Sequence, residues 1–459
     1  MAMAMAMPPI FKLPDELIVQ ITTYLPQVDL YQLSLVSKRV GLIAQKTLHH
    51  TPDIWLRPSP AGGYIRFLVR TLSSRPDLAA TVRTLAVFAF NREVEVDVDV
   101  LPAVQANITP LMPGLKFTIN EQKLVGILLI LTTHLRHLAL GVSDKHEMID
   151  SHPLRPSYNV PGGLFGYHTS DWATTPFDLS QIPGLKGLQS LRIDVGQLDW
   201  SWFALPSLKN LYVSQPHSLR DYTALPASSN LRKIELRTDL RALEHRDSAF
   251  NRHFPSFLSH VDKLKEVALT AKDFGGVRTA TGMSWATLIS RFEPSYSKLE
   301  HLKLRFGDPG LLPNALPVST LGMFVRLRYL YLPQDVLLGK PSEVIASTKC
   351  PNTLLPSSLE RLTIIYPTLD IIHWLRKLKD CYDHFTGLLR ILILASEIYG
   401  DGYEQFRYKK LPNHGLNWAK FRVRITYPGG EKREVWKDPN YDPFICEIVD
   451  FINSLSIEA

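Results

Sequence analysis

The sequence predicts an α/β solenoid with parallel concave strands, preceded by a short helical unit. A hexad of the form apolar-x-x-apolar-x-apolar recurs between residues 82 and 394, and its last two apolar positions alternate as in a half-buried strand. Apolar stripes at helical spacing lie between the hexads. Stacked units of one strand and one helix or loop form a solenoid that buries a continuous core.

The bulk composition agrees with a folded chain in a reducing compartment. The chain has 459 residues, of which 45% are hydrophobic and 21% charged, and only 3 cysteines, which are far apart. We therefore expect cytoplasmic or nuclear localisation, or both. Residues 1–9 lack the pattern of a secretory signal and are expected to be a disordered tail. The most apolar run, Leu124 to Leu131, is far below the roughly 20 residues of a membrane span.

Three short helices are predicted over residues 10–56. The segment Leu13-Pro14-Asp15-Glu16-Leu17 opens the first, because proline suits the first helical position and the carboxylates complement the helix dipole. Asp29 and Gln32 resemble a capping box for the second helix, and Ser37 is expected to cap the third. A unit this small buries little surface and usually needs a partner.

These residues resemble the F-box family in order and spacing. The matching positions are Leu13 to Leu17, Ile21, Tyr24 to Pro26, Asp29 to Leu30 and Leu33 to Arg39, whereas Val40 stands where many F-boxes carry an aromatic residue. The resemblance implies docking on the Skp adaptor of an SCF (Skp–cullin–F-box) ubiquitin ligase, with the cullin ligase core as a further partner. The implied adaptor-binding residues are Leu13, Pro14, Glu16, Leu17, Ile18, Ile21, Leu25, Leu30, Leu33 and Val36.

The repeats begin after residues 57–80, which we assign to a linker helix. The hexads start at Val82, Leu135, Leu188, Leu208, Leu231, Leu264, Leu299, Leu327, Leu359 and Leu389. Stripes such as Trp285, Leu288, Ile289 and Phe292 are expected to cover the other side of the strands. The pattern resembles a leucine-rich repeat only loosely, because spacing varies from 20 residues (Leu188 to Leu208) to 53 (Leu135 to Leu188). We therefore predict an irregular leucine-rich-repeat solenoid over residues 81–420.

Two segments depart from the repeat pattern. Residues 143–184 are rich in Pro, Gly and Ser and carry no hexad, so we expect an inserted loop. Residues 421–459 are assigned to a cap, with a hairpin that pairs residues 421–427 with 431–436 and a closing helix near 442–455.

No motif for catalysis, nucleotide binding, a cofactor or a metal is found, so we expect a non-catalytic protein. The alternating segment Glu93 to Val100 places four carboxylates on one face, and we favour a solvated strand edge over a cation or basic-peptide site. The basic and aromatic segment Tyr403 to Lys437 is interpreted as a solvated cap face rather than a site for an acidic peptide, phosphate or nucleic acid.

The expected function is that of a substrate-receptor subunit in an SCF-type ligase, with the repeats binding a protein substrate. One alternative is a repeat scaffold outside any ligase, in which the helical unit only caps the solenoid. Another is a nucleic-acid-binding repeat protein, which a formal net charge of +7 spread over this length does not favour.

The expected substrate-binding residues flank the last two apolar positions of the hexads, because such residues face away from the core. Arg and Tyr are enriched at binding hot spots, and arginines hold carboxylates and phosphates well. We therefore expect an acidic or phosphorylated segment as ligand. Its predicted contacts are Tyr212, Arg237, Lys303, Arg305, Tyr329 and Tyr331.

Overall fold

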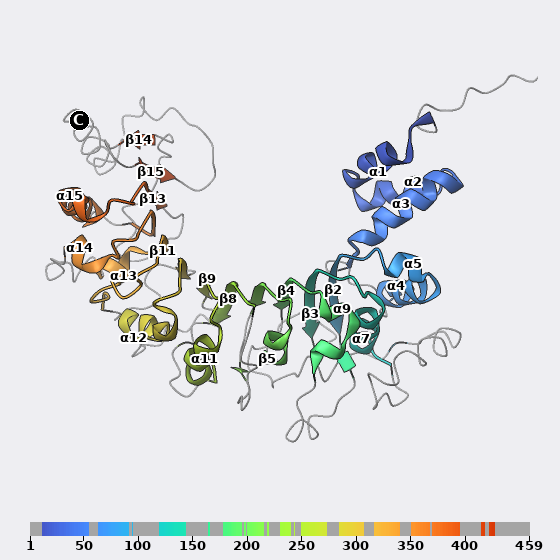
Figure 1. The fold of residues 1–459 in the computed structure, drawn as a ribbon, viewed down its shortest axis with the longest axis horizontal. Helices are drawn as coiled ribbons and strands as arrows, with labels where there is room; N and C mark the ends of the chain where they lie inside the picture. The colour runs from blue at the N-terminus through green and yellow to red at the C-terminus, as the bar shows by residue number, and fades with distance from the viewer. Residues whose placement is uncertain are drawn as a thin grey trace, which may run out of the picture. The chain divides into compact units, whose positions relative to one another are not determined.

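Three helices form the N-terminal part of the computed structural model: α1 (Asp15–Thr23), α2 (Gln27–Ser34) and α3 (Lys38–His50) (Figure 1). Ser37 caps α3 as predicted, because its hydroxyl accepts a hydrogen bond from the Val40 N–H at 3.2 Å. The capping box at Asp29 is wrong. Helix α2 begins directly after Pro26, so Asp29 lies inside its first turn.

The structure describes residues 12–54, 63–90, 94, 119–143, 164–165, 178–194, 197–198, 200–214, 218–219, 230–239, 243, 249–272, 284–306, 316–339, 350–367, 370–394, 415–417 and 422–426. The chain forms two units, Met1–Leu211 and Tyr212–Ala459, and each is described by itself. The predicted tail at residues 1–9 and the closing helix lie outside the described residues. So do most of the Glu93–Val100 and Tyr403–Lys437 segments.

The first unit continues from the helices into a parallel sheet. Its elements are β1 (Asp53–Ile54), α4 (Gly63–Ser74), α5 (Pro76–Ala79), β2 (Thr84–Phe90), α7 (Glu121–Leu131), β3 (His137–Ser143), η4 (Leu179–Gln181), α9 (Pro183–Lys186), β4 (Ser190–Asp194), β5 (Gln197–Leu198) and η5 (Trp200–Ala204), and β6 (Asn210–Ser214) starts at its end. Strands β1, β2, β3 and β4 pair in this order, all in parallel.

The second unit repeats the same arrangement. Its elements are β7 (Ser218–Leu219), β8 (Lys233–Asp239), α11 (Ala249–His260), β9 (Glu266–Lys272), α12 (Trp285–Ser290), η6 (Glu293–Ser295), β10 (His301–Phe306), β11 (Tyr329–Pro333), α13 (Gln334–Leu338), α14 (Pro351–Leu354), β12 (Arg361–Ile365), α15 (Asp370–Asp380), η8 (Tyr382–His384), β13 (Arg390–Leu394), β14 (Gly415–Asn417) and β15 (Arg422–Thr426). Strands β8 to β13, followed by β15, are parallel neighbours.

Each hexad supplies one strand and part of the core. The strand begins two residues after the first apolar position, as at Leu299, where β10 starts at His301. All three apolar positions of that hexad are buried, and so is the predicted stripe of α12. The opposite sheet face carries the alternate side chains. We call this the open face.

The register of the last predicted hexad is wrong by one residue. Strand β13 pairs Ile391 with Leu362 and Ile393 with Ile364, so the buried frame starts at Leu388 and not at Leu389. Leu388 is 0% exposed and Leu389 is 65% exposed. Because side chains alternate along a strand, a slip of one residue exchanges the two faces.

The C-terminal hairpin is predicted to pair residues 421–427 with 431–436, and the second of these segments lies outside the described residues. Both edges of β15 are occupied, since β15 pairs in parallel with β13 and in antiparallel with β14. Strand β15 continues the repeat frame, with Val423 opposite Ile391, but the first hexad position there is Lys420, which hid the repeat from the apolar pattern.

The last residues of the loop predicted over residues 143–184 do not form a loop in the structure. Asp178 accepts a hydrogen bond from the Ser180 N–H at 2.9 Å and opens η4, and Pro183 occupies the start of α9. Leu179, Ile182 and Leu185 are buried. Residues 179–184 therefore form helical turns that contribute to the core.

The corrected register predicts unequal effects of two neighbouring leucine substitutions. Leu388→Ala should lower the free energy of unfolding by about 2–5 kcal/mol, because it leaves a cavity in the core. Leu389→Ala should change it by less than about 0.5 kcal/mol. Urea unfolding followed by circular dichroism measures both. Equal losses, or a larger loss for Leu389→Ala, would contradict this register.

Candidate functional site

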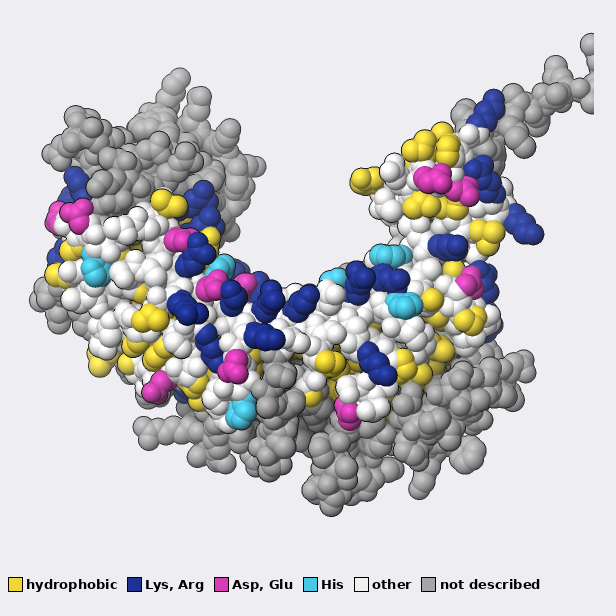
Figure 2. Space-filling model, in the orientation of Figure 1, with side chains coloured by type: hydrophobic (Ala, Val, Ile, Leu, Met, Phe, Trp, Pro, Cys, Tyr) yellow, Lys and Arg dark blue, Asp and Glu magenta, His cyan; other side chains and the backbone are white. Residues whose placement is uncertain are grey.

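The three N-terminal helices expose an unusual number of large apolar side chains. Their exposed fractions run from 41% for Ile21 to 88% for Tyr24. Figure 2 shows hydrophobic side chains gathered over α1–α3. The set, which we call the apolar helix surface, comprises Leu17, Val19, Ile21, Tyr24, Val28, Tyr31, Leu35, Val36 and Leu42. Exposed apolar side chains gathered in this way mark interaction sites.

The structure divides the predicted adaptor residues into surface and core. Those exposed are Pro14, Glu16, Leu17, Ile21 and Val36, and those half-buried are Leu13, Leu25 and Leu33. Ile18 and Leu30 are only 1% and 4% exposed. These two residues hold the helices together, and they affect a partner only through the fold.

Sequence reasoning missed several members of the apolar helix surface: Val19, Tyr24, Val28, Tyr31, Leu35 and Leu42. The signal was present, because these apolar residues lie outside the buried stripe of each helix. A motif specifies residue types and their order along the chain. It does not show which of these residues are buried in the core of the three helices.

The helices are held by close backbone contact and by polar bonds. A Cβ atom at Gly41 in α3 would lie 2.5 Å from the Ser34 carbonyl oxygen at the end of α2, so only glycine allows this approach. The Thr22 and Thr47 hydroxyls are 2.9 Å apart. The Arg39–Asp15 ion pair, at 2.7 Å, links the starts of α3 and α1, but both groups are well exposed and it adds little stability.

Comparison with known families then decides what this unit is. Residues 10–55 match the F-box-like family. The F-box therefore comprises α1, α2 and α3 and includes the apolar helix surface. No curated protein matches the sequence of the chain.

The F-box runs directly into the sheet of the first unit. The Arg83 N–H donates to the His50 carbonyl at 3.0 Å, and the Ala86 N–H donates to the Pro52 carbonyl at 3.1 Å. Strand β1, which follows α3, pairs with β2. Burial, together with the Arg83 charge, lowers the pKa of His50. Main-chain bonds thus attach the F-box to the first repeat.

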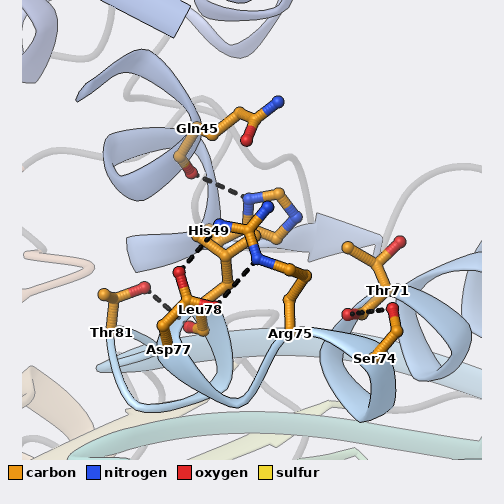
Figure 3. Close-up of polar contacts among 8 residues, drawn as sticks. All are labelled: Gln45, His49, Thr71, Ser74, Arg75, Asp77, Leu78 and Thr81. Carbon is orange, nitrogen blue, oxygen red and sulfur yellow. Dashed lines mark hydrogen bonds and ion pairs between the residues drawn. The ribbon is translucent and has the colours of Figure 1, made fainter. Parts of the chain in front are cut away.

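Figure 3 shows a polar corner formed by α4 and α5 together with the end of α3. The Arg75 guanidinium donates two hydrogen bonds to the Asp77 carboxylate, at 2.9 Å and 2.7 Å. The Thr81 hydroxyl donates to the Leu78 carbonyl at 2.7 Å, which closes the turn after α5. At the end of α3, the His49 ring nitrogen Nδ1 lies 2.8 Å from the Gln45 carbonyl oxygen.

The corner predicts how Asp77 titrates. The hydrogen bonds from Arg75 lower the pKa of Asp77 from 3.8 to about 2. A lowered pKa in the folded state stabilises the fold above the ordinary value, and this contribution is lost as the pH falls from 3.8 towards 2. NMR titration should give a midpoint near 2 for Asp77 in the native chain and a higher one, closer to the ordinary value, in Arg75→Gln. Arg70→Gln, on the neighbouring helix, should leave the midpoint unchanged.

A second candidate surface is the open face of the second unit. Strand pairing places its side chains in rows that run across the strands. The first row is Lys233, Glu266, His301, Tyr329, Arg361 and Arg390, and the second is Glu235, Ala268, Lys303, Tyr331, Thr363 and Leu392. A third row holds Arg237, Thr270 and Arg305 on β8, β9 and β10. Figure 2 shows Lys and Arg side chains gathered in this region.

Several side chains of the first row are engaged with one another. Lys233 Nζ lies 2.5 Å from Glu266 Oε1. The His301 and Tyr329 ring centroids are 4.1 Å apart, and the Arg361 guanidinium lies over the Tyr329 ring at 5.2 Å. Burial lowers the pKa of His301. Tyr329 is therefore fixed between two neighbours.

Tyr331 packs against an apolar cluster near the ends of the strands. It packs with Leu394 against buried Ile365 and Tyr366, and the Lys303 ammonium lies 4.9 Å from its ring centroid. Tyr366 has a φ of 53°, and its hydroxyl donates to the Phe306 carbonyl at 2.6 Å. Burial raises the pKa of Tyr331, and the nearby Arg305 charge opposes this shift.

The predicted substrate residues are thus brought together in part. Arg237, Lys303, Arg305, Tyr329 and Tyr331 share the open face of β8, β10 and β11, and Lys303 and Arg305 are the exposed ones. Tyr212 lies on β6 and is half-buried.

Sequence reasoning left out the contacts that organise this face. His301 and Arg361 hold Tyr329, and Ile365 and Tyr366 support Tyr331. The hexad frame places His301 and Arg361 on the open face, but only the register shows that both meet Tyr329.

Two negative findings apply to the described part of the chain. Within it, no group of three or more His, Cys, Asp and Glu side chains is placed to hold a metal ion. Among the helices described, none has the length and apolar character needed to cross a membrane.

Proposed function

We propose that the protein is a substrate-receptor subunit of an SCF-type ubiquitin ligase. The F-box binds the Skp adaptor and, through it, the cullin core, and the repeats bind a protein substrate. The observation that carries this proposal is the apolar helix surface on the helices that match the F-box-like family. A unit of about 45 residues with this much exposed apolar area gains stability by burying it against a partner.

The repeats fit the receptor role as irregular leucine-rich repeats. Each supplies one parallel strand, the buried hexad side chains form the core, and the open face remains for a ligand. The receptor itself transfers nothing. Its contribution is proximity, because it raises the effective concentration of substrate near the ligase. This role places the protein in the cytoplasm, the nucleus or both.

Adaptor binding should depend on Leu17, which is 44% exposed on α1. Leu17→Lys should lower adaptor affinity by more than about 30-fold, because burying an unpaired charge costs at least about 2 kcal/mol. Gln20→Lys adds the same charge at an exposed polar position of α1 and should bind within about twofold of the native chain. Purified adaptor and full-length chain, measured by calorimetry, give both constants.

Two results would contradict the proposal. One is a native chain that does not bind the adaptor, which would favour the repeat scaffold outside any ligase. The other is a Leu17→Lys variant that keeps its circular dichroism spectrum and binds as well as the native chain. That outcome would move the adaptor contact away from the apolar helix surface.

A further inference from the structure

The open face of the second unit carries a group of cations that no carboxylate of the described residues pairs with. Arg237 on β8 and Lys303 and Arg305 on β10 form neither ion pairs nor hydrogen bonds within the part of the chain that the structure describes. By contrast, Lys233 is paired with Glu266 in the first row. We call Arg237, Lys303 and Arg305 the cation cluster.

The strand register brings this cluster around two short side chains. Arg237 and Arg305 both lie opposite Thr270 of β9, from its two sides, and Lys303 lies opposite Ala268. Neighbouring strands are about 4.8 Å apart, so the two arginines start about 10 Å apart with only a threonine between them. Long guanidinium side chains at this spacing can reach one anionic group together.

The local charge favours an anion. The positions opposite Ala268 and Thr270 carry three cations and one carboxylate, Glu235. Arginine forks form paired hydrogen bonds with carboxylate and phosphate oxygens, and bonds between charged groups are the strong ones.

An apolar contact lies next to the cation cluster. Tyr331 and Leu394 are half-buried and rest on Ile365 and Tyr366. Tyr331 touches the cluster directly, because Lys303 lies over its ring. A ligand that fits both parts therefore combines an anionic group with an apolar one.

We propose that the cation cluster and the Tyr331 side chain form the substrate site. It takes an extended protein segment in which an anionic side chain, a carboxylate or a phosphate, stands beside an apolar residue. This inference rests on the proposed receptor function, which makes the ligand a protein. The carboxylates Glu235 and Glu266 on the same face disfavour a long uniform polyanion such as nucleic acid.

The test uses the full-length chain and degenerate peptide libraries with one fixed central residue, namely serine, aspartate or phosphoserine, followed by leucine or by glycine. Fluorescence polarisation should show that an anionic centre binds about tenfold or more tighter than serine. Leucine should strengthen binding relative to glycine. Whichever library binds more tightly, the aspartate or the phosphoserine one, shows whether the anion is a carboxylate or a phosphate.

Matched variants locate the site. Arg237→Gln and Arg305→Gln should each weaken the anionic libraries about tenfold, and Tyr331→Ala should remove the preference for leucine. Arg326→Gln removes an exposed charge from a turn of the same unit and should change nothing.

The inference is overturned if serine libraries bind as well as anionic ones, if Arg326→Gln costs as much as Arg305→Gln, or if a single-stranded oligonucleotide displaces the peptides at equal concentration. Adaptor binding is measured on the same samples. If the chain selects peptides as expected but does not bind the adaptor, only the ligase role is wrong. If it binds the adaptor but does not select peptides, only the substrate site is wrong.

Discussion

The repeats depend on a ladder of main-chain hydrogen bonds at the starting ends of the strands. In the second unit, the carbonyl of the residue before each strand accepts the N–H groups of two successive residues of the next repeat. Arg232 accepts from Lys265 and Glu266, and the same pattern recurs at Lys265, Glu300, Arg328 and Glu360, with distances of 2.8–3.2 Å. This ladder fixes the register of neighbouring repeats. Because it fixes the register, it also decides which side chains meet on the open face.

A corresponding ladder in the first unit reaches into the F-box. It runs from the His50 carbonyl through Arg83, Arg136 and Gln189. His50 is the last residue of α3, so the helix that contributes to the apolar helix surface also supplies the first rung. The F-box and the first repeat are thus consecutive members of one hydrogen-bonded series. The F-box is therefore held in a defined relation to the first repeats.

The sequence predicted what depends on local pattern and failed where the pattern was ambiguous. Ser37 and the hexads were found because a cap and a buried alternation need particular residue types at fixed spacing. The last register failed because Leu388 and Leu389 are both apolar, and only strand pairing separates them. The sequence predicted which side chains lie on the open face. It did not predict which of them contact one another, because Lys303 meets Tyr331 through a neighbouring strand that lies 28 residues away in the sequence (303 to 331).

Tyr366 has a consequence for how the second unit unfolds. In a simple solenoid each repeat contacts only its neighbours, and stability is a sum of independent units and interfaces. The Tyr366 hydroxyl instead bonds the end of β12 to the end of β10 and passes over β11. A second-neighbour link of this kind couples β12 to β10 across β11, so local opening of β12 also breaks a hydrogen bond to β10. A ligand that docks on Lys303 and Tyr331 therefore meets a preorganised surface and loses little binding energy to ordering it.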